Sequence, residues 1–238
     1  MDSVASGTVL LDLDGTLVDS ATGITEHLSS ALASVGAREH LPAALRGYIG
    51  PPFADFMPDL GLDADQVLAA TAEYRRTYDP VAASLSRPYP GILALLDRLR
   101  RKGIRLAVAT SKPESLARVI VTDNGLAGYF EVIGGADHAQ ERTGKAAVVG
   151  SVLDRLGRVD GARVMVGDRL HDVQGAAAHG LVTIGVSWGY AQPDELVNAG
   201  AISVVDSPEE LGDRLLQECQ PARSLSPAVG GPSVVGRT

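Results

Sequence analysis

Two aspartates stand one residue apart at the end of an apolar segment near the start of the chain. The segment reads LLDLDGTL, and Asp12 and Asp14 are followed at once by Gly15. Two carboxylates this close repel each other, so the pair needs a nearby cation or a carboxyl that keeps its proton. One interpretation is a deliberate concentration of negative charge at a site. The alternatives are the polar face of a half-solvated strand and, for Asp14, a carboxylate that only caps a turn.

Two later apolar segments also end in polar residues whose side chains could bind a ligand. LAVATSKP carries Thr110, Ser111 and Lys112, and VMVGDRLHD carries Asp168 and Asp172. Ligands of an open parallel sheet bind beyond the carboxyl ends of the strands, where the strand order reverses. If the first segment is a central strand between the other two, all of these residues converge on one site.

Six short apolar runs, rich in β-branched residues and bounded by turn residues, predict the strands that position this site. They span residues 8–13, 105–110, 130–135, 163–168, 182–186 and 202–206. Segments with helical spacing of apolar residues separate the later runs, which predicts βαβ units and a parallel sheet covered on both faces. The predicted fold class is therefore α/β, with a doubly wound, Rossmann-like parallel sheet.

The connection between the first and second predicted strands is too long for a single crossover. About 90 residues separate Asp14 from Arg105, whereas a complete βαβ unit needs about 30. Apolar stripes with helical spacing occupy the excess, which predicts an inserted helical subdomain. The predicted organisation is a core at 1–20 and 85–218, a helical insertion at 21–84, and a disordered, Pro-, Gly- and Ser-rich tail at 219–238.

Composition limits the partners of the chain. A net charge of −8 argues against general affinity for nucleic acid or anionic membranes, so an anionic substrate must be met locally by a metal or a few cations. Cys219 is the single cysteine, which fits a reducing compartment. The start lacks the features of a signal peptide, and no apolar run approaches the roughly 18 residues of a membrane span. We therefore expect a cytoplasmic protein, and its oligomeric state has no signature in the sequence.

Four motifs, in order along residues 8–215, resemble those of the haloacid dehalogenase superfamily of aspartate-nucleophile phosphohydrolases. They are LLDLDGTL, LAVATSKP, Lys145 in ERTGKAAVV, and VGDRLHD. The insertion between the first two motifs resembles a type 1 cap, and the chain is similar to the phosphoglycolate phosphatase-like branch. The resemblance implies Mg²⁺-dependent hydrolysis of a small phosphorylated metabolite, phosphoglycolate-like or a nucleoside monophosphate, through an aspartyl phosphate.

The resemblance also implies a role for each motif residue. Asp12 would attack phosphorus, and Asp14 would protonate the leaving group and then activate water. Mg²⁺ would be held by the Asp12 carboxylate, the Asp14 backbone carbonyl and the Asp168 carboxylate, while Asp172 would steady the site or contact a metal-bound water. The phosphoryl oxygens would be held by the Thr110 hydroxyl, the Lys145 ammonium, and the backbone N–H groups of Gly15 and Ser111.

Some assignments stay open at this point. Lys112 is the alternative to Lys145, because the family often has proline directly after its lysine and this chain has Ala146. An acid at Asp14 disfavours the dehalogenases and ion pumps of the superfamily, which lack one there. A phosphotransferase or phosphomutase that uses the same aspartyl phosphate, including transfer to or from a protein hydroxyl, remains the alternative to a hydrolase. A receiver domain and a P-loop kinase are disfavoured, because neither explains the motif order.

Weaker signals lie around these motifs. GYIGPPF at 47–53 has a Gly-Pro-Pro sequence that a helix interior does not tolerate, and it resembles a specificity loop that faces the core site. Arg46 could meet an anionic leaving group or remain solvated. Arg169 could tune the charge of the site or pair with a neighbouring acid. His171 could lie near the metal site, but a solvent-facing position is favoured, and Trp188 is predicted to pack rather than contact substrate.

Overall fold

The computed structural model describes residues 7–137, 142–158 and 161–219. Its centre is a six-stranded sheet with the order β5-β4-β1-β6-β7-β8. The strands are β1 (Gly7–Leu11), β4 (Arg105–Pro113), β5 (Val132–Ala136), β6 (Ala162–Gly167), β7 (Val182–Val186) and β8 (Ser203–Val205). Every pairing in this sheet is parallel. The six predicted strands and the doubly wound α/β fold are therefore confirmed.

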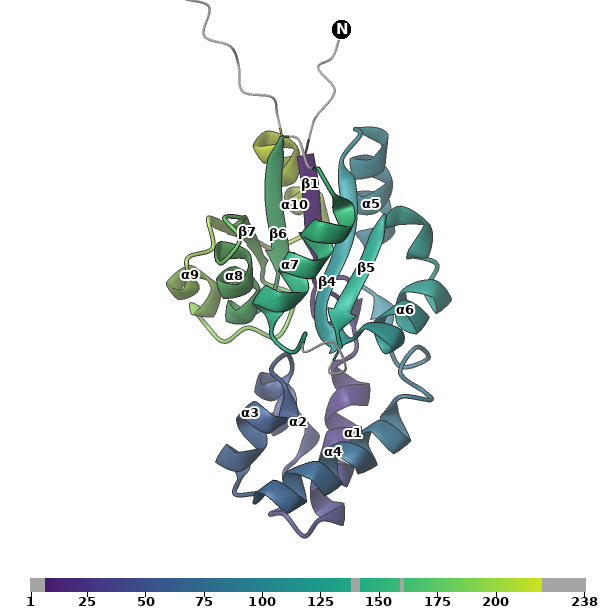
Figure 1. The fold of residues 1–238 in the computed structure, drawn as a ribbon, viewed down its shortest axis with the longest axis vertical. Helices are drawn as coiled ribbons and strands as arrows, with labels where there is room; N and C mark the ends of the chain where they lie inside the picture. The colour runs from purple at the N-terminus through teal and green to yellow at the C-terminus, as the bar shows by residue number, and fades with distance from the viewer. Residues whose placement is uncertain (1–6, 138–141, 159–160, 220–238) are drawn as a thin grey trace, which may run out of the picture.

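Helices cover both faces of the sheet (Figure 1). One face carries α7 and α8, and the other carries α5, α6 and α10, while α9 contacts α8 and β8. Their bounds are α5 (Ile92–Arg101), α6 (Glu114–Asp123), α7 (Lys145–Leu156), α8 (Leu170–Ala177), α9 (Glu195–Ala199) and α10 (Pro208–Glu218), with a 3₁₀ turn, η3, at Ala127–Tyr129. The result is a three-layer arrangement in which the sheet lies between two helical layers.

Strand β1 is buried along its whole length because both of its faces are covered. Its Leu10 belongs to the apolar cluster under α7, whereas Val9 and Leu11 belong to the cluster on the opposite face. Alternating side chains of one strand thus serve two cores. This explains why the run before Asp12 is apolar without alternation, and it excludes the half-solvated strand.

A group of helices lies beyond the carboxyl ends of the strands, in the lower part of Figure 1. They are α1 (Ala21–Ser34), α2 (Pro42–Leu45), α3 (Phe53–Phe56) and α4 (Ala64–Tyr78), with 3₁₀ turns η1 (Arg46–Tyr48) and η2 (Met57–Leu60). Helices α1 and α4 pack against each other. All of them fall within residues 21–84, which we call the proposed cap.

Short local signals set the edges of the proposed cap. Strands β2 (Val18–Asp19) and β3 (Arg87–Pro88) pair antiparallel where the chain leaves the core and where it returns. Helix α4 begins at a capping box in which the Asp63 carboxylate accepts from the Gln66 N–H at 2.8 Å and the Gln66 side chain accepts from the Asp63 N–H at 3.0 Å. The β2–β3 pairing places the outgoing and returning segments of the chain side by side.

The described part of the chain ends at Cys219, which is fully buried. Its sulfur packs against Gly7 at the start of β1, where a Cβ atom would come within 2.6 Å of it. Cys219 therefore belongs to the core and not to the predicted tail, whose other residues, 220–238, lie outside the described residues. No helix in the described ranges is long and apolar enough to span a membrane.

Candidate active site

The carboxyl ends of three adjacent strands bring the motif residues together. Strand β1 lies between β4 and β6, as the convergence of the motifs requires. The Asp12 N–H donates to the Val166 carbonyl at 2.9 Å, which extends the β1–β6 pairing by one residue. This bond fixes Asp12 beside Asp168, the first residue after β6.

Three buried carboxylates form the centre of the site. Asp12, Asp168 and Asp172 each present an oxygen within 4.8 Å of the others. Asp168 accepts from the Thr16 hydroxyl at 3.1 Å and from the Tyr190 N–H at 2.8 Å. Asp172 accepts from the N–H of Arg169, three residues earlier in the chain, at 3.0 Å. The protein thus holds these carboxylates in position before any ligand arrives.

Lys145 is the cation of this cluster. It is the first residue of α7, and its Nζ lies 2.9 Å from Asp12 Oδ1 and 2.7 Å from Asp172 Oδ1. It also donates to the Ala109 carbonyl at 3.1 Å. Lys112, the alternative, lies instead 2.9 Å from Asp14 Oδ2. The geometry therefore places Lys145 beside the expected nucleophile and Lys112 beside the expected acid–base group.

The charges of the cluster are not balanced. Burial raises the pKa of Asp12 to about 6, and the Lys145 charge only partly offsets this. Burial, together with the charges of Asp172 and Asp12, raises the pKa of Asp168 well above its usual value. Burial alone would lower the pKa of Lys145, but the adjacent carboxylates raise it above its ordinary value. One ammonium cannot neutralise three carboxylates, so the all-oxygen site has both the charge and the ligands for a cation such as Mg²⁺.

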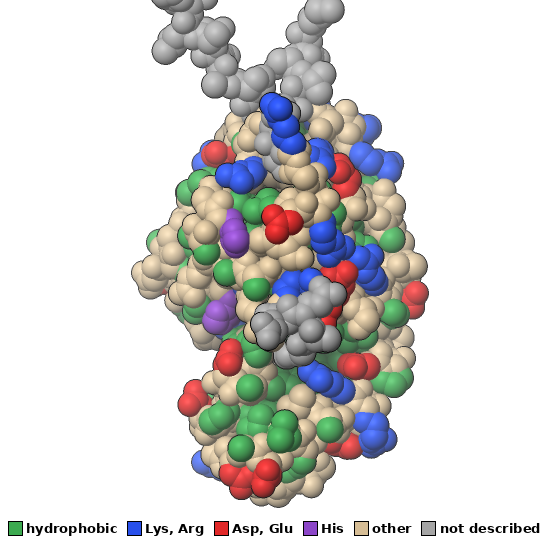
Figure 2. Space-filling model, viewed as in Figure 1, with side chains coloured by type: hydrophobic (Ala, Val, Ile, Leu, Met, Phe, Trp, Pro, Cys, Tyr) green, Lys and Arg blue, Asp and Glu red, His purple; other side chains and the backbone are tan. Residues whose placement is uncertain are grey.

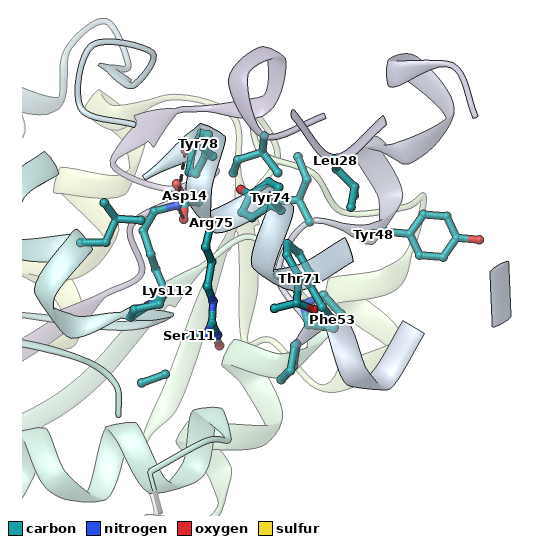
Figure 3. A pocket seen from close by; sticks show the side chains of 18 of the residues that line it. Asp14, Leu28, Tyr48, Phe53, Thr71, Tyr74, Arg75, Tyr78, Ser111 and Lys112 are labelled. Atoms are coloured by element: carbon teal, nitrogen blue, oxygen red, sulfur yellow. Dashed lines mark hydrogen bonds and ion pairs between the residues drawn. The ribbon is translucent and has the colours of Figure 1, made fainter. Parts of the chain in front are cut away.

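Asp14 faces away from the cluster and toward the proposed cap. Its Oδ1 accepts from the Ser20 hydroxyl at 2.6 Å and its Oδ2 pairs with Lys112. The Lys112 ammonium also lies 3.5 Å from the Tyr78 hydroxyl of α4 and 5.0 Å from the centre of that ring. Figure 3 shows Asp14, Lys112 and Tyr78 grouped at one end of a pocket. The Asp14 side chain is thus held by a hydroxyl and an ammonium.

Gly15 allows the close approach of this loop to Asp168. Its φ angle is +81°, and a Cβ atom there would lie 2.2 Å from Asp168 Oδ2. Its N–H, expected to face the phosphoryl group, donates to the Val18 carbonyl at 2.9 Å. Thr110 and Ser111 line the pocket beside Asp14, and the Thr110 oxygen accepts from the Lys112 N–H at 3.3 Å.

A cavity of about 430 Å³ connects these residues to the proposed cap. Asp12, Asp14 and Thr110 line it from the core, and residues 48–53 and parts of α4 line it from the proposed cap. The expectation that the 47–53 loop faces the core site is therefore confirmed for 48–53. Figure 3 shows Tyr48 and Phe53 of this loop together with Thr71, Tyr74 and Arg75 of α4.

Arg46 does not line this cavity. Its guanidinium donates to the Gly189 carbonyl at 3.3 Å and lies 4.9 Å from the centre of the Tyr190 ring. Arg46 thus connects the proposed cap to the loop after β7. These contacts explain the position of its side chain, and no anionic leaving group is needed to explain it. Arg46 is exposed, so of the two alternatives considered from the sequence, the solvated arginine describes it better than contact with a leaving group.

Arg169 links the core to the same cap loop. It is buried, pairs with Glu195 at 2.8 Å and donates to the Ile49 carbonyl. The predicted pairing with an acid is confirmed, although Glu195 is distant in sequence. His171 is half-buried, and burial lowers its pKa. Trp188 packs as predicted, with its Nε1 donating to a backbone carbonyl at 3.2 Å.

Two residues of the site, Thr16 and Tyr190, were not predicted from the sequence, and both hold Asp168. The Tyr190 N–H holds Asp168, and its hydroxyl accepts from the Ser20 N–H at 3.0 Å. Thr16 lies within the first motif, but only the aspartates and the glycine of that motif were assigned roles. Proximity of Thr16 to the aspartates was the one signal that could have identified it, whereas Tyr190 had none.

Comparison with known proteins agrees with this geometry. A family model described as haloacid dehalogenase-like hydrolase matches residues 9–186. The tyrosine-protein kinase PtkA of Mycobacterium tuberculosis is 41% identical over 186 residues, a match that covers 78% of this chain and 64% of the kinase. The chain therefore spans less than two thirds of the length of this relative.

Two phosphatases match over more of their length. A 5′-nucleotidase of Pseudomonas aeruginosa is 38% identical, with 79% of this chain and 86% of that protein covered. A phosphoglycolate phosphatase of Rhodospirillum rubrum is 35% identical, with 87% and 90% covered. The crystal structure of a predicted phosphatase from Clostridium acetobutylicum superimposes with a TM-score of 0.83 at 34% identity, covering 89% of this chain and 99% of that one. The chain belongs to the haloacid dehalogenase-like hydrolase family.

Proposed function

We propose that this protein is a Mg²⁺-dependent phosphomonoester hydrolase that acts on a small phosphorylated metabolite through a phosphoryl group carried on Asp12. The observation that supports it best is the position of Asp12, beside Lys145 and two further carboxylates and at the wall of a cavity. The likeness to phosphoglycolate and nucleotide phosphatases supports the substrate class. Residues 21–84 act as a cap that closes over the phosphate site, and the single cysteine favours a cytoplasmic location.

The proposed reaction has two steps, transfer of the phosphoryl group to Asp12 and its hydrolysis by water. Asp12 attacks phosphorus and the bond to the leaving oxygen breaks, while Asp14 donates a proton to that oxygen. Asp14 then takes a proton from water, which attacks phosphorus and releases Asp12 and inorganic phosphate. The Ser20 and Lys112 contacts keep Asp14 aimed at the cavity. Attack and proton transfer thus come from one short loop.

The phosphoryl group carries charge that the site must bind. Lys145 and the Thr110 hydroxyl, with the Ser111 N–H, hold its oxygens in this proposal. The Asp12 and Asp168 carboxylates and the Asp14 backbone carbonyl hold Mg²⁺, which when bound offsets repulsion between the carboxylates and the phosphoryl oxygens. Both oxygens of Asp172 already contact protein groups, Lys145 and the Arg169 N–H. Asp172 therefore positions the Lys145 ammonium and is not one of the proposed Mg²⁺ ligands.

A screen of phosphate release tests the proposal. Phosphoglycolate, nucleoside monophosphates, sugar phosphates and p-nitrophenyl phosphate are compared in Mg²⁺ and in EDTA. We expect Mg²⁺-dependent release that Asp12→Asn abolishes, whereas Asp154→Asn, an exposed aspartate of α7, keeps wild-type rates. Appreciable turnover by a folded Asp12→Asn variant would sink the nucleophile assignment.

The likeness to PtkA supports a second candidate, a phosphotransferase that uses the same Asp12 chemistry. Such an enzyme passes the phosphoryl group to an acceptor hydroxyl, including one on a protein, in place of water. Rapid-quench kinetics distinguish the two. A transferase shows a burst of phosphoenzyme whose decay accelerates with added acceptor, whereas a hydrolase releases phosphate at a rate that acceptors do not change.

A further inference from the structure

The cavity is polar where it meets the core and mostly apolar where it meets the proposed cap. Its cap wall includes Leu28, Tyr48, Pro52, Phe53, Leu68 and Tyr74. Phe53 and Tyr74 meet edge to face with ring centres 4.7 Å apart, so they form one continuous aromatic surface. Figure 2 shows that hydrophobic side chains also gather on the outside of the cap region, and Leu68 is 70% exposed. A leaving group bound here contacts hydrocarbon and aromatic surfaces.

The size of the cavity is informative about the leaving group. At about 430 Å³ it lies within the range of sites that bind drug-sized ligands. A two-carbon acid such as glycolate occupies on the order of 100 Å³, about three times the volume share of one water. Glycolate would leave most of the apolar wall uncovered, so the wall fits a larger body.

One cation of the cavity, Arg75, has only a longer-range electrostatic partner among the described residues, Asp79, whose burial-raised pKa it lowers. Among the basic residues that line the cavity, Lys112 pairs with Asp14 and Arg169 pairs with Glu195. Within the described residues, no hydrogen bond or ion pair joins the Arg75 guanidinium to another side chain. Figure 3 shows Arg75 extending from α4 between the apolar cap wall and the core residues. Its donors are therefore available to a ligand.

We propose that the substrate is a phosphomonoester whose leaving group carries a planar aromatic ring, as in a nucleoside 5′-monophosphate, and that Arg75 determines this specificity. The ring lies on the aromatic cap wall, and the Arg75 guanidinium donates to oxygen atoms of the substrate between that ring and the scissile bond. The inference rests on the proposed function, because it assigns the leaving-group end of the same site.

Arg76 offers a matched control for Arg75. The two arginines are adjacent on α4 and both are exposed, but Arg76 pairs with Glu73 at 2.7 Å and does not line the cavity. Each is changed to methionine, which keeps the length of the side chain and removes the charge. Loss of a charge-assisted hydrogen bond predicts a 10- to 100-fold rise in KM for adenosine 5′-monophosphate in Arg75→Met, with little change in kcat. Arg76→Met should behave as wild type.

Equilibrium binding keeps the test independent of turnover. Asp12→Asn, Asp12→Asn/Arg75→Met and Asp12→Asn/Arg76→Met are titrated with adenosine 5′-monophosphate, ribose 5-phosphate and phosphoglycolate in Mg²⁺ by calorimetry. We expect the first variant to bind the nucleotide at least tenfold more tightly than the other two ligands. Only the Arg75 change should weaken nucleotide binding.

Two results would overturn the inference. One is equal or tighter binding of phosphoglycolate, which would mean that the apolar wall does not contact the leaving group. The other is an equal effect of the Arg75 and Arg76 changes. A failure of Mg²⁺-dependent phosphate release by the wild-type protein from every phosphomonoester would instead count against the proposed function, while the binding series would still decide the specificity.

Discussion

Replacement of Gly15 by alanine should damage the site through Asp168. A Cβ atom at this position would lie 2.2 Å from Asp168 Oδ2, whereas ordinary contacts begin near 3.4 Å, so one group must move by about 1 Å. The carboxylate cannot move freely, because Thr16 and the Tyr190 N–H hold its two oxygens. The φ angle of +81° is also unfavourable for alanine.

Gly125 separates these two effects. Its φ angle is +72°, and no atom lies within 4 Å of the position a Cβ would take. Gly125→Ala should therefore carry only the backbone strain, about 1–2 kcal/mol. Gly15→Ala should add roughly 1–3 kcal/mol for overpacking. Displacing Asp168 by about 1 Å should also lower kcat/KM on the order of 100-fold.

Urea unfolding and steady-state kinetics measure the two quantities. Trp188 is the single tryptophan, and its ring packs on Tyr89 with a centroid distance of 6.3 Å, so its fluorescence reports unfolding. Turnover of p-nitrophenyl phosphate in Mg²⁺ reports the site. Equal losses of stability in the two alanine variants, with activity retained in Gly15→Ala, would show that Asp168 does not lie against Gly15.

Three further predictions concern the charged groups. Lys145→Met should raise the inhibition constant of inorganic phosphate at least tenfold while Lys112→Met should not, and the reverse order would move the phosphoryl-binding role to Lys112. Asp14→Asn should slow an alkyl phosphate far more than p-nitrophenyl phosphate, because an aryl leaving group needs less proton donation; equal losses would contradict the acid role. The folded pKa of Asp12, about 6, exceeds its ordinary value of 3.8, so metal-free stability should fall by about 2 kcal/mol as pH rises from 4 to 7. Urea unfolding in EDTA should show this fall and saturating Mg²⁺ should reduce it, whereas a flat profile in EDTA would refute it.

The fold was largely predictable because its signals are local or topological. Apolar runs of β-branched residues identify strands, and the handedness of βαβ connections limits how they assemble. The end of β4 was less predictable. The strand continues to Pro113, three residues beyond the predicted run, because Pro113 pairs with Ala136 after an irregular stretch of the β4–β5 ladder.

Residue types and their order predicted a chemistry for the site, but they did not predict the contacts around it. Two carboxylates before a glycine, followed by a strand that ends in threonine and a second pair of acids, predict phosphoryl transfer because they resemble the motifs of a known superfamily. The sequence could not decide which lysine contacts Asp12. Lys112 follows a predicted strand and Lys145 begins a helix, so either position is suitable. The structure separates them by placing one on Asp12 and the other on Asp14.

By itself, therefore, the sequence determined the fold class, and it predicted the nucleophile and acid pair and the need for a cation. Only the tertiary structure decided that Arg169 reaches the Ile49 carbonyl and that Arg46 reaches the Gly189 carbonyl in the loop after β7. It also decided that Arg75 lines an apolar cavity without a hydrogen bond or ion pair to any described side chain. The physical reason is that these two pairings, of Arg169 and of Arg46, join residues 120 and 143 positions apart. These contacts depend on strand register and on the position of the proposed cap over the sheet. No local sequence pattern encodes the register or that position.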